Sequence, residues 1–380
     1  MLVVNWRCPR NPLAGGAEVY LRETFSRLVS RGHHVVLLSE RFPGSASEDM
    51  VEGIRIIRAG GKFTFNFTAG RLVGRLAEAL NADVVIDDLN KIPFYSPWHT
   101  KRPVLAILMH LFRGSIFRET LPPMAAYVWM AETIIPLAYK RCRFAVLSDS
   151  SKQDTVEVGI DPERIAVVPP GTDFGRFSPD AAVPREPIVL HVGRLKRYKA
   201  TDHLLQAARL LKERGVKFAA VIVGGGDAKP GLEALAAKLE LAESVRFTGF
   251  VPEAEKVNWY RRAAVLVENS VKEGWGLIVM EANACGTPVV VADSAGLRDS
   301  SRDGVNGLVY PCGDVASLAE KLERLLADDA LRLRLGRQAI DWAKQWTWDG
   351  AADAMEQVIR QTIAEAEAAP RNHGTQGQSR

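Results

Sequence analysis

Two glutamates, Glu273 and Glu281, stand eight positions apart in the stretch KEGWGLIVMEANACG at residues 272–286. The second lies in an apolar run typical of a buried helix, where a carboxylate is costly unless hydrogen-bond donors satisfy it. A ribose diol offers two hydroxyl donors that match the two oxygens of one carboxylate. Glu281 therefore suits a ribose whose hydroxyls arrive with a ligand, and the alternative is a basic partner from the protein core.

The first acid, Glu273, lies in a glycine-containing loop, where its carboxylate can accept hydrogen bonds from sugar hydroxyls. The backbone N–H groups of Gly274, Trp275, Gly276 and Leu277 are expected at a helix N-terminus, where they can face phosphate or sugar oxygen atoms. The alternative is that Glu273 is merely an acid at the start of a helix.

Two cations, Arg194 and Lys199, follow the apolar run PIVLHVG and stand five positions apart. Arginine grips phosphate oxygens through two hydrogen bonds and lysine supplies a compact charge, so this pair suits a diphosphate. The alternative is a solvated basic turn that also includes Lys196 and Arg197.

Further candidates follow other apolar runs. Gly15 and Gly16 precede an expected helix, whose free N–H groups could bind an anion, or they form a plain turn. Gly225, in a run of three glycines, could expose backbone in a tight turn. Val251, after VRFTGF, could border a flat base, or could belong to a turn packed on the core. His110 follows VLAIL, and a lone histidine is more often structural.

These candidates all follow short Val, Ile and Leu runs that alternate with helical patterns. Such strands are typical of parallel sheets covered on both faces. Strands are expected near 2–6, 34–38, 52–58, 83–87, 104–108 and 144–148, with helices at 17–32 and 132–142. A proline-rich linker at 172–187 follows, and the alternation then restarts with helices at 201–214, 230–240, 253–262 and from Gly276. The pattern predicts two α/β domains with ligands bound beyond the strand ends.

The composition is that of a globular protein, and 380 residues suggest two domains at about 150 residues each. No apolar run reaches the roughly 18 residues of a membrane span, and MLVVNWRCPRNP lacks the features of a signal peptide. The four cysteines have no metal-ligand spacing, so we expect free thiols in a reducing cytoplasm: Cys8, Cys142, Cys285 and Cys312.

Charge is spread unevenly along the chain. Residues 1–148 hold 19 Lys and Arg against 12 Asp and Glu, and the remainder holds 30 against 33. Residues 111–143 mix basic, aromatic and aliphatic side chains, which suits a peripheral contact with an anionic membrane; ordinary helix packing is the alternative. The sequence contains no basic repeat or aromatic platform of the kind that would indicate nucleic-acid binding.

The segments GGAEVYL, GRLKRYKATD, GGGD, GFV and EGWGLIVMEANACGTPVVVAD, in this order, resemble retaining glycosyltransferases of the GT-B fold, specifically the GT4 family. The last segment is similar to the EX7E signature of that family. The resemblance runs from Gly15 to WTWDGAA at 346–352. It implies two Rossmann-like α/β/α domains facing a central cleft: residues 1–172 for the acceptor, with a C-terminal helix at about 350–367 that crosses back, and residues 173–349 for the nucleotide sugar. Residues 368–380 are expected to be a disordered tail.

The resemblance also implies residue roles. Arg194 and Lys199 would bind the donor diphosphate and stabilise it as it leaves, while His110 and Glu273 would lie beside the transferred sugar. The implied donor-binding residues also include Gly15, Gly16, Gly225, Val251, Gly274, Trp275, Gly276, Leu277 and Glu281, with Glu281 on the ribose and Val251 near the base.

The implied reaction transfers a hexose-type sugar, with retention, from a UDP- or GDP-linked donor to a hydroxyl of a glycan or lipid-linked acceptor in cell-envelope or polysaccharide biosynthesis. The protein would be cytoplasmic, with peripheral contact at the inner face of the membrane. We expect no enzyme nucleophile, no cofactor and, because no DxD motif stands near the site, no obligatory metal. The alternatives are a nucleotide-sugar epimerase of the same fold and a non-catalytic sugar-nucleotide-binding protein.

Overall fold

The computed structural model describes residues 1–89, 92–118 and 120–368. Apart from residue 368, the tail predicted to be disordered lies outside the described residues. Most strands occur where continuous apolar runs predicted them. They are β1 (Leu2–Val4), β2 (Val36–Ser39), β3 (Glu48–Val51), β4 (Ile54–Arg58), β5 (Val85–Asp88), β6 (Val104–Leu108), β7 (Arg143–Val146), β8 (Ile165–Val167), β9 (Glu186–Val192), β10 (Ala219–Val223), β11 (Val245–Gly249), β12 (Ala263–Glu268), β13 (Val289–Asp293) and β14 (Gly307–Pro311).

The strands form two separate sheets, with the orders β3-β4-β2-β1-β5-β6-β7-β8 and β11-β10-β9-β12-β13-β14. Among the described strands, the β3–β4 hairpin is antiparallel and the other neighbours run parallel. The strands are apolar because a parallel sheet is covered on both faces, and every residue of β6 and β12 is buried. The prediction of two α/β units is confirmed, and the sheets lie on either side of the linker at 172–187.

Helices connect and cover the strands. In the first unit they are α1 (Gly16–Ser30), α2 (Phe65–Ala79), α3 (Pro122–Ala138) and α4 (Asp149–Glu157). In the second they are α5 (Thr201–Glu213), α6 (Lys229–Lys238), α7 (Glu253–Arg262), α8 (Leu277–Ala284), α9 (Leu297–Ser300), α10 (Val315–Ala327) and α11 (Asp329–Ala343). Helix α5 packs against α6 and α10, and α8 packs against α11.

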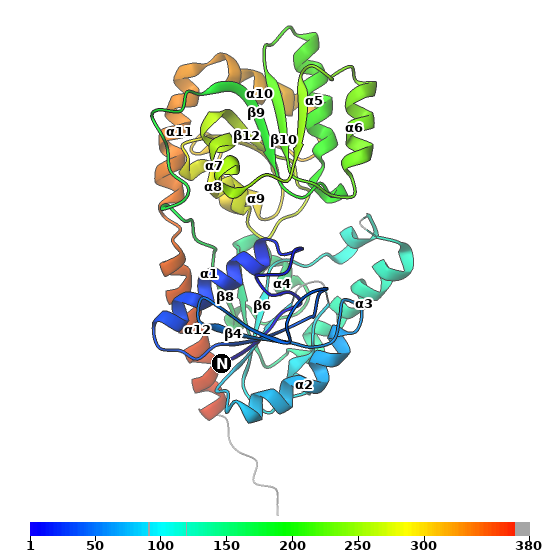
Figure 1. The fold of residues 1–380 in the computed structure, drawn as a ribbon, viewed down its shortest axis with the longest axis vertical. Helices are drawn as coiled ribbons and strands as arrows, with labels where there is room; N and C mark the ends of the chain where they lie inside the picture. The colour runs from blue at the N-terminus through cyan, green and yellow to red at the C-terminus, as the bar shows by residue number, and fades with distance from the viewer. Residues whose placement is uncertain (90–91, 119, 369–380) are drawn as a thin grey trace, which may run out of the picture.

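The last described helix, α12 (Trp348–Ala368), returns from the second unit to the first, as predicted. Figure 1 shows it in red beside α1 and the first sheet. Its buried face includes Ala352 and Met355, which join the core around α1. Ion pairs add to this contact: Arg27 Nε lies 2.9 Å from Asp349 Oδ1, and Arg31 Nη1 lies 3.1 Å from Glu356 Oε2.

The prediction for α3 is wrong at both ends. The helix begins at Pro122, ten residues before the predicted start, and ends at Ala138 with Pro136 in its last turn. Its first half escaped detection because apolar side chains lie on its exposed face as well as its buried face, which removes the helical periodicity. The exposed large apolar residues here are Leu121, Met124, Tyr127, Trp129, Met130 and Leu137.

Candidate functional site

The glycine loop before α1 faces the loop after β9. A Cβ atom added at Gly15 would lie 3.4 Å from Cζ of Arg194, and one added at Gly16 would lie 3.3 Å from Cδ1 of Leu277. The strand ends of the two units therefore meet, and predicted residues from both units lie together. Arg194 itself is exposed, so its guanidinium is open to a ligand.

A second contact joins the units at the Glu273 loop. A Cβ atom at Gly274 would lie 2.6 Å from the carbonyl oxygen of Met109, the residue before His110. This separation is shorter than real Cβ contacts allow, so a side chain at Gly274 would push the units apart. The glycine brings the Glu273 loop against the end of β6.

Glu18 shapes the glycine loop from inside α1. Its Oε2 atom accepts a hydrogen bond of 2.6 Å from the Gly15 N–H, which caps the first turn of the helix. The carboxyl group is buried, and burial raises its pKa despite the hydrogen bond from Gly15 and the charges of Arg7 and Arg194. Sequence analysis did not single out Glu18, although an acid three positions after a cap residue is a recognisable signal.

Lys199 and Glu273 form the central ion pair. The Lys199 Nζ atom lies 2.6 Å from Glu273 Oε1 and 3.6 Å from Glu268 Oε2. Burial alone would lower the pKa of Lys199, but Glu268 and then Glu273 raise it above its ordinary value. Burial likewise acts to raise the pKa of Glu273, but the Lys199 charge and hydrogen bond lower it overall. Both groups are therefore charged at neutral pH.

Glu268 belongs to this cluster, although sequence analysis did not identify it. It is the last residue of β12 and is fully buried. Its Oε1 atom accepts hydrogen bonds from the Ser270 hydroxyl and from the Ser270 N–H at 3.3 Å. The available signal was an acid at the end of a buried strand, in AVLVENS.

The backbone of the Glu273 loop is held by the loop after β13. The Glu273 N–H donates to the Ala295 carbonyl at 3.0 Å, and a Cβ atom at Gly296 would lie 2.2 Å from the Glu273 carbonyl oxygen. Gly276 has φ +110°, which a residue with a side chain adopts only with strain, and it starts α8. The free N–H groups of α8 therefore face the same region as Glu273.

Glu281 lies one turn into α8, as predicted, but it does not lack protein partners. Its Oε2 atom accepts a 2.7 Å hydrogen bond from the Tyr260 hydroxyl and lies 3.0 Å from Lys256 Nζ. The expectation that its donors would arrive with a ligand is wrong for this oxygen, and the alternative of a basic partner from the protein holds, because α7 supplies a hydroxyl and a cation. Burial, followed by the Glu281 charge, raises the pKa of Tyr260 well above its ordinary value. A ribose-binding role for Glu281 stays a prediction.

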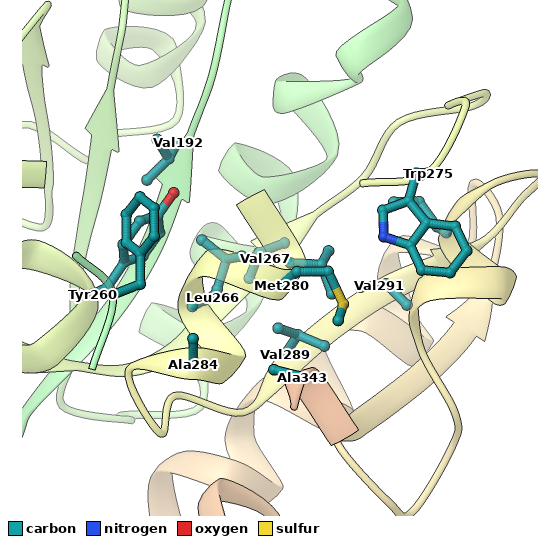
Figure 2. Packing of buried hydrophobic residues seen from close by; sticks show 14 of the residues in the cluster. Val192, Tyr260, Leu266, Val267, Trp275, Met280, Ala284, Val289, Val291 and Ala343 are labelled. Carbon is teal, nitrogen blue, oxygen red and sulfur yellow. The ribbon is translucent and has the colours of Figure 1, made fainter. Parts of the chain in front are cut away.

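Trp275 has its side chain in the core. The indole is 4% exposed and packs edge-on against Trp346, with ring centroids 5.0 Å apart. Figure 2 shows it among the buried apolar residues of this unit, with Met280 and Val291. Because its side chain is buried, Trp275 can contact a ligand only through its backbone, although it was predicted to bind the donor.

Gly225 and Val251 lie at the neighbouring ends of β10 and β11. The Gly225 carbonyl accepts from the Leu195 N–H at 2.9 Å, which connects it to the Arg194 loop. A Cβ atom at Gly225 would lie 2.7 Å from the ring of Phe250, whose side chain is 80% exposed. Backbone and an exposed aromatic ring thus border this edge, and its use for a base stays a prediction.

His110 lies just after β6, with its ring centroid 4.7 Å from that of Phe112. A positive charge on His110 would act to lower the pKa of Glu273, so the two groups share one electrostatic environment. The loop is fixed by Glu132 of α3, whose buried carboxylate accepts from the Phe112 N–H at 2.7 Å and the Arg113 N–H at 2.6 Å. Sequence analysis missed Glu132.

An open pocket of about 800 Å³ lies beside the Arg194–Lys199 loop. Its walls come from both units, with Phe117 and Leu121 on one side and Lys196 and Arg197 on the other. Within the described residues, no helix is long and apolar enough to cross a membrane. In the same residues, no group of three or more His, Cys, Asp or Glu side chains is placed to hold a metal ion. All four cysteines are free thiols.

Two family models match adjoining segments of the chain. The model described as Glycosyltransferase Family 4 matches residues 14–176, and that described as Glycosyl transferases group 1 matches residues 176–342. The two α/β units are therefore those of a glycosyltransferase with the GT-B fold. The chain belongs to glycosyltransferase family 4.

A relative from Thermomonospora curvata, named D-inositol 3-phosphate glycosyltransferase, is 31% identical over 391 residues that cover 91% of this chain and 90% of the relative. A relative of the same name from Streptomyces bingchenggensis is 38% identical over 229 residues, which cover 54% of this chain and 49% of that protein. The match thus spans about half the length of the second relative.

Solved structures share the fold at lower identity. Sucrose-phosphate synthase from Thermosynechococcus elongatus has a TM-score of 0.79 at 23% identity, covering 96% of this chain and 99% of the other. HepE from Anabaena, solved in complex with UDP-glucose, has a TM-score of 0.75 at 17% identity, covering 96% and 99%. These likenesses show the fold.

Proposed function

We propose that the protein transfers a hexose-type sugar from a UDP- or GDP-linked donor to an acceptor hydroxyl, with retention of the anomeric configuration. The observation that carries the proposal is the cluster in which the Lys199 ammonium lies 2.6 Å from Glu273 while Arg194 faces the Gly15 loop. Two cations suit a departing diphosphate, and Glu273 suits the hydroxyls of the attached sugar.

The proposed mechanism relies on placement and leaving-group stabilisation. Arg194, Lys199 and the α8 N-terminus would hold the diphosphate as its bond to the sugar breaks, while a diphosphate oxygen takes the proton of the attacking hydroxyl on the same face. The carboxyl of Glu18 is buried and bound to the Gly15 N–H, and Glu273 is paired with Lys199. Neither side chain is presented as a free nucleophile, which supports a mechanism without a covalent sugar–enzyme intermediate.

We also propose that no obligatory metal or cofactor takes part. The Arg194 guanidinium and the Lys199 ammonium together supply two positive charges, which can balance the charge of a diphosphate without a divalent ion. Donor turnover measured with excess EDTA should equal turnover with added Mg²⁺. A loss of about tenfold or more in EDTA, restored by Mg²⁺, would contradict this part of the proposal.

For the acceptor we propose a glycan or lipid-linked molecule made at the inner face of the membrane, bound by the first unit. The supporting observation is the exposed apolar side of α3, which includes Tyr127, Trp129 and Leu137, with the exposed cation Lys140 next to it. A second candidate is a phosphorylated polyol, because the relatives from Thermomonospora curvata and Streptomyces bingchenggensis are named D-inositol 3-phosphate glycosyltransferases.

Release of free nucleotide from a donor panel tests the function. UDP-glucose, UDP-N-acetylglucosamine and GDP-mannose would each be incubated alone, with D-inositol 3-phosphate and with a polyprenyl-diphosphate-linked sugar. Release that depends on one of these acceptors supports transfer and selects the acceptor class. An epimerised donor without nucleotide release would establish the epimerase alternative, and binding without either reaction would establish a non-catalytic role.

A further inference from the structure

Glu268 is a buried acid at the donor site that the proposed mechanism does not use. Its side chain is 1% exposed, and Oε2 faces Lys199 Nζ at 3.6 Å. The other oxygen is fixed by Ser270, through the hydroxyl and through the backbone N–H at 3.3 Å. An ionised carboxylate held so deeply needs a counter-charge, and Lys199 is the cation that the structure places against it.

Lys199 thus lies near two acids that differ in how firmly the protein holds them. Glu273 belongs to a loop that faces the ligand region, and its side chain is 18% exposed. Glu268 ends a central strand of the second sheet and cannot move without disturbing β12. When the hydroxyls of a donor sugar donate hydrogen bonds to Glu273, Glu268 is the fixed counter-ion that remains for the ammonium among the described residues.

We propose that Glu268 is a positioning residue for the glycosyl transfer: it holds the Lys199 ammonium at the place where the leaving diphosphate develops its charge. The inference rests on the proposed function, because it assumes that Lys199 acts on the diphosphate. Glu268 does not itself touch the donor. Preorganised charges of this kind stabilise a transition state without having to move during the reaction.

Substitution of Glu268 should change the pH dependence of activity, which substitution of a purely structural residue would not do. The groups that face Lys199 are Glu268 from β12, Glu273 and Tyr198 from the adjoining loops, and His191 from β9, which burial keeps neutral. Burial lowers the pKa of Lys199, and Glu268 is the strongest opposing influence. In Glu268→Gln, Lys199 should therefore lose its proton, and with it activity, at a lower pH than in the wild type.

The test compares Glu268→Gln with the wild type, using nucleotide release from the donor and acceptor that the panel selects. We expect kcat to fall on the order of tenfold to a hundredfold, KM for the donor to change about threefold or less, and the alkaline loss of activity to begin at least about one pH unit lower. Glu268→Asp keeps the negative charge, so its activity should be lost at the same alkaline pH as that of the wild type. Asp293→Asn is the matched control, because Asp293 ends the neighbouring strand and pairs with Arg298 at 3.0 Å.

A second measurement separates folding from catalysis. Lys199→Met leaves Glu268 buried without a counter-ion, so we expect its Tm to fall and the double variant Lys199→Met, Glu268→Gln to recover Tm but not activity. Wild-type kcat and a wild-type alkaline limb in folded Glu268→Gln, with Lys199→Met inactive, would overturn this inference and leave the proposed function standing. Wild-type kcat in Lys199→Met would instead overturn the site on which both depend.

Discussion

At the scale of single residues, Glu281 lies one turn into α8 and is bound to Tyr260 and Lys256 through one oxygen. Glu281→Ala should lower affinity for UDP or GDP by about tenfold or more, because one carboxylate can accept two ribose hydroxyls. The variant should remain folded, because Lys256 keeps its ion pair with Glu253, in which Nζ lies 3.1 Å from Oε1. Isothermal titration with the nucleotide measures the loss, and Glu253→Ala is the matched control. Unchanged affinity in Glu281→Ala would remove the ribose assignment.

Gly274 offers a second test at this scale. In Gly274→Ala the added Cβ would meet the Met109 carbonyl oxygen at 2.6 Å, so the Glu273 loop and the His110 loop must separate. We expect kcat to fall by about a hundredfold, because positioning is the main source of catalysis here. Gly61→Ala is the control, since a Cβ there meets nothing within 4 Å. Equal kcat values in the two variants would show that the contact between the loops has no catalytic importance.

Residue types and spacing were enough to identify Arg194, Lys199, Glu273 and Glu281 as candidates. They did not single out Glu268 or Glu132, because the contacts that bring these acids to the site, with Lys199 and with residues 112 and 113, do not join neighbours in the chain. Glu132 binds the backbone of residues 112 and 113, a contact that exists only after α3 has folded over the end of β6. The same limit explains why a basic partner for Glu281 was expected only as an alternative, without Lys256 or Tyr260 being named.

At the scale of elements, α3 is connected to the His110 loop through Glu132. Glu132→Ala removes the acceptor for two backbone N–H groups, and Arg113 has the unfavourable φ of +50° that this carboxylate helps to maintain. We expect kcat to fall about tenfold or more, with little change in nucleotide affinity. Thr133→Ala, at the next and exposed position of α3, is the control. Wild-type kcat in Glu132→Ala would show that the contact between α3 and the His110 loop does not influence catalysis.

The return helix α12 gives a prediction about stability and pH. Arg360, His33 and Arg31 lower the pKa of Glu356 to about 2. A carboxyl with a lowered folded-state pKa contributes stability above its ordinary pKa and loses that contribution as the pH falls through the lowered value. Glu356→Gln should therefore have a lower Tm than the wild type at pH 7, and the difference should shrink progressively below about pH 4.5. A difference that is constant between pH 7 and pH 2 would contradict this role.

Elements with regular apolar patterns were predicted well, and α3 was not. The strand β14 and the helices α10 and α11 also fell outside the sequence prediction, although α10 has an amphipathic pattern with Leu318 and Leu322 buried. The boundaries of α3 depend on packing of its buried face and on exposure of its apolar face. The sequence pattern cannot reveal such exposure, because it does not show which apolar side chains are left uncovered.

At the scale of the whole molecule, the exposed side of α3 and the basic first unit bear on where the protein acts. We expect the protein to sediment with vesicles that contain phosphatidylglycerol, because anionic lipid attracts its basic residues. Little of it should sediment with vesicles of phosphatidylcholine alone. Trp129→Ser should weaken this binding, whereas Phe63→Ser, which replaces a residue 82% exposed in the turn before α2, should not. Equal sedimentation with both vesicle types would contradict the predicted membrane contact.

Loops of the two units meet, because Arg194 lies against Gly15 and the Glu273 loop lies against the carbonyl of Met109, the residue before His110. The central claim is that this arrangement transfers a sugar with retention, without an enzyme nucleophile. The most direct measurement is the anomeric configuration of the first-formed product by ¹H NMR, using an α-linked nucleotide sugar and the acceptor that the panel selects. The account predicts an α-linked product from wild-type protein and loss of that product in Lys199→Met. A β-linked product would contradict it.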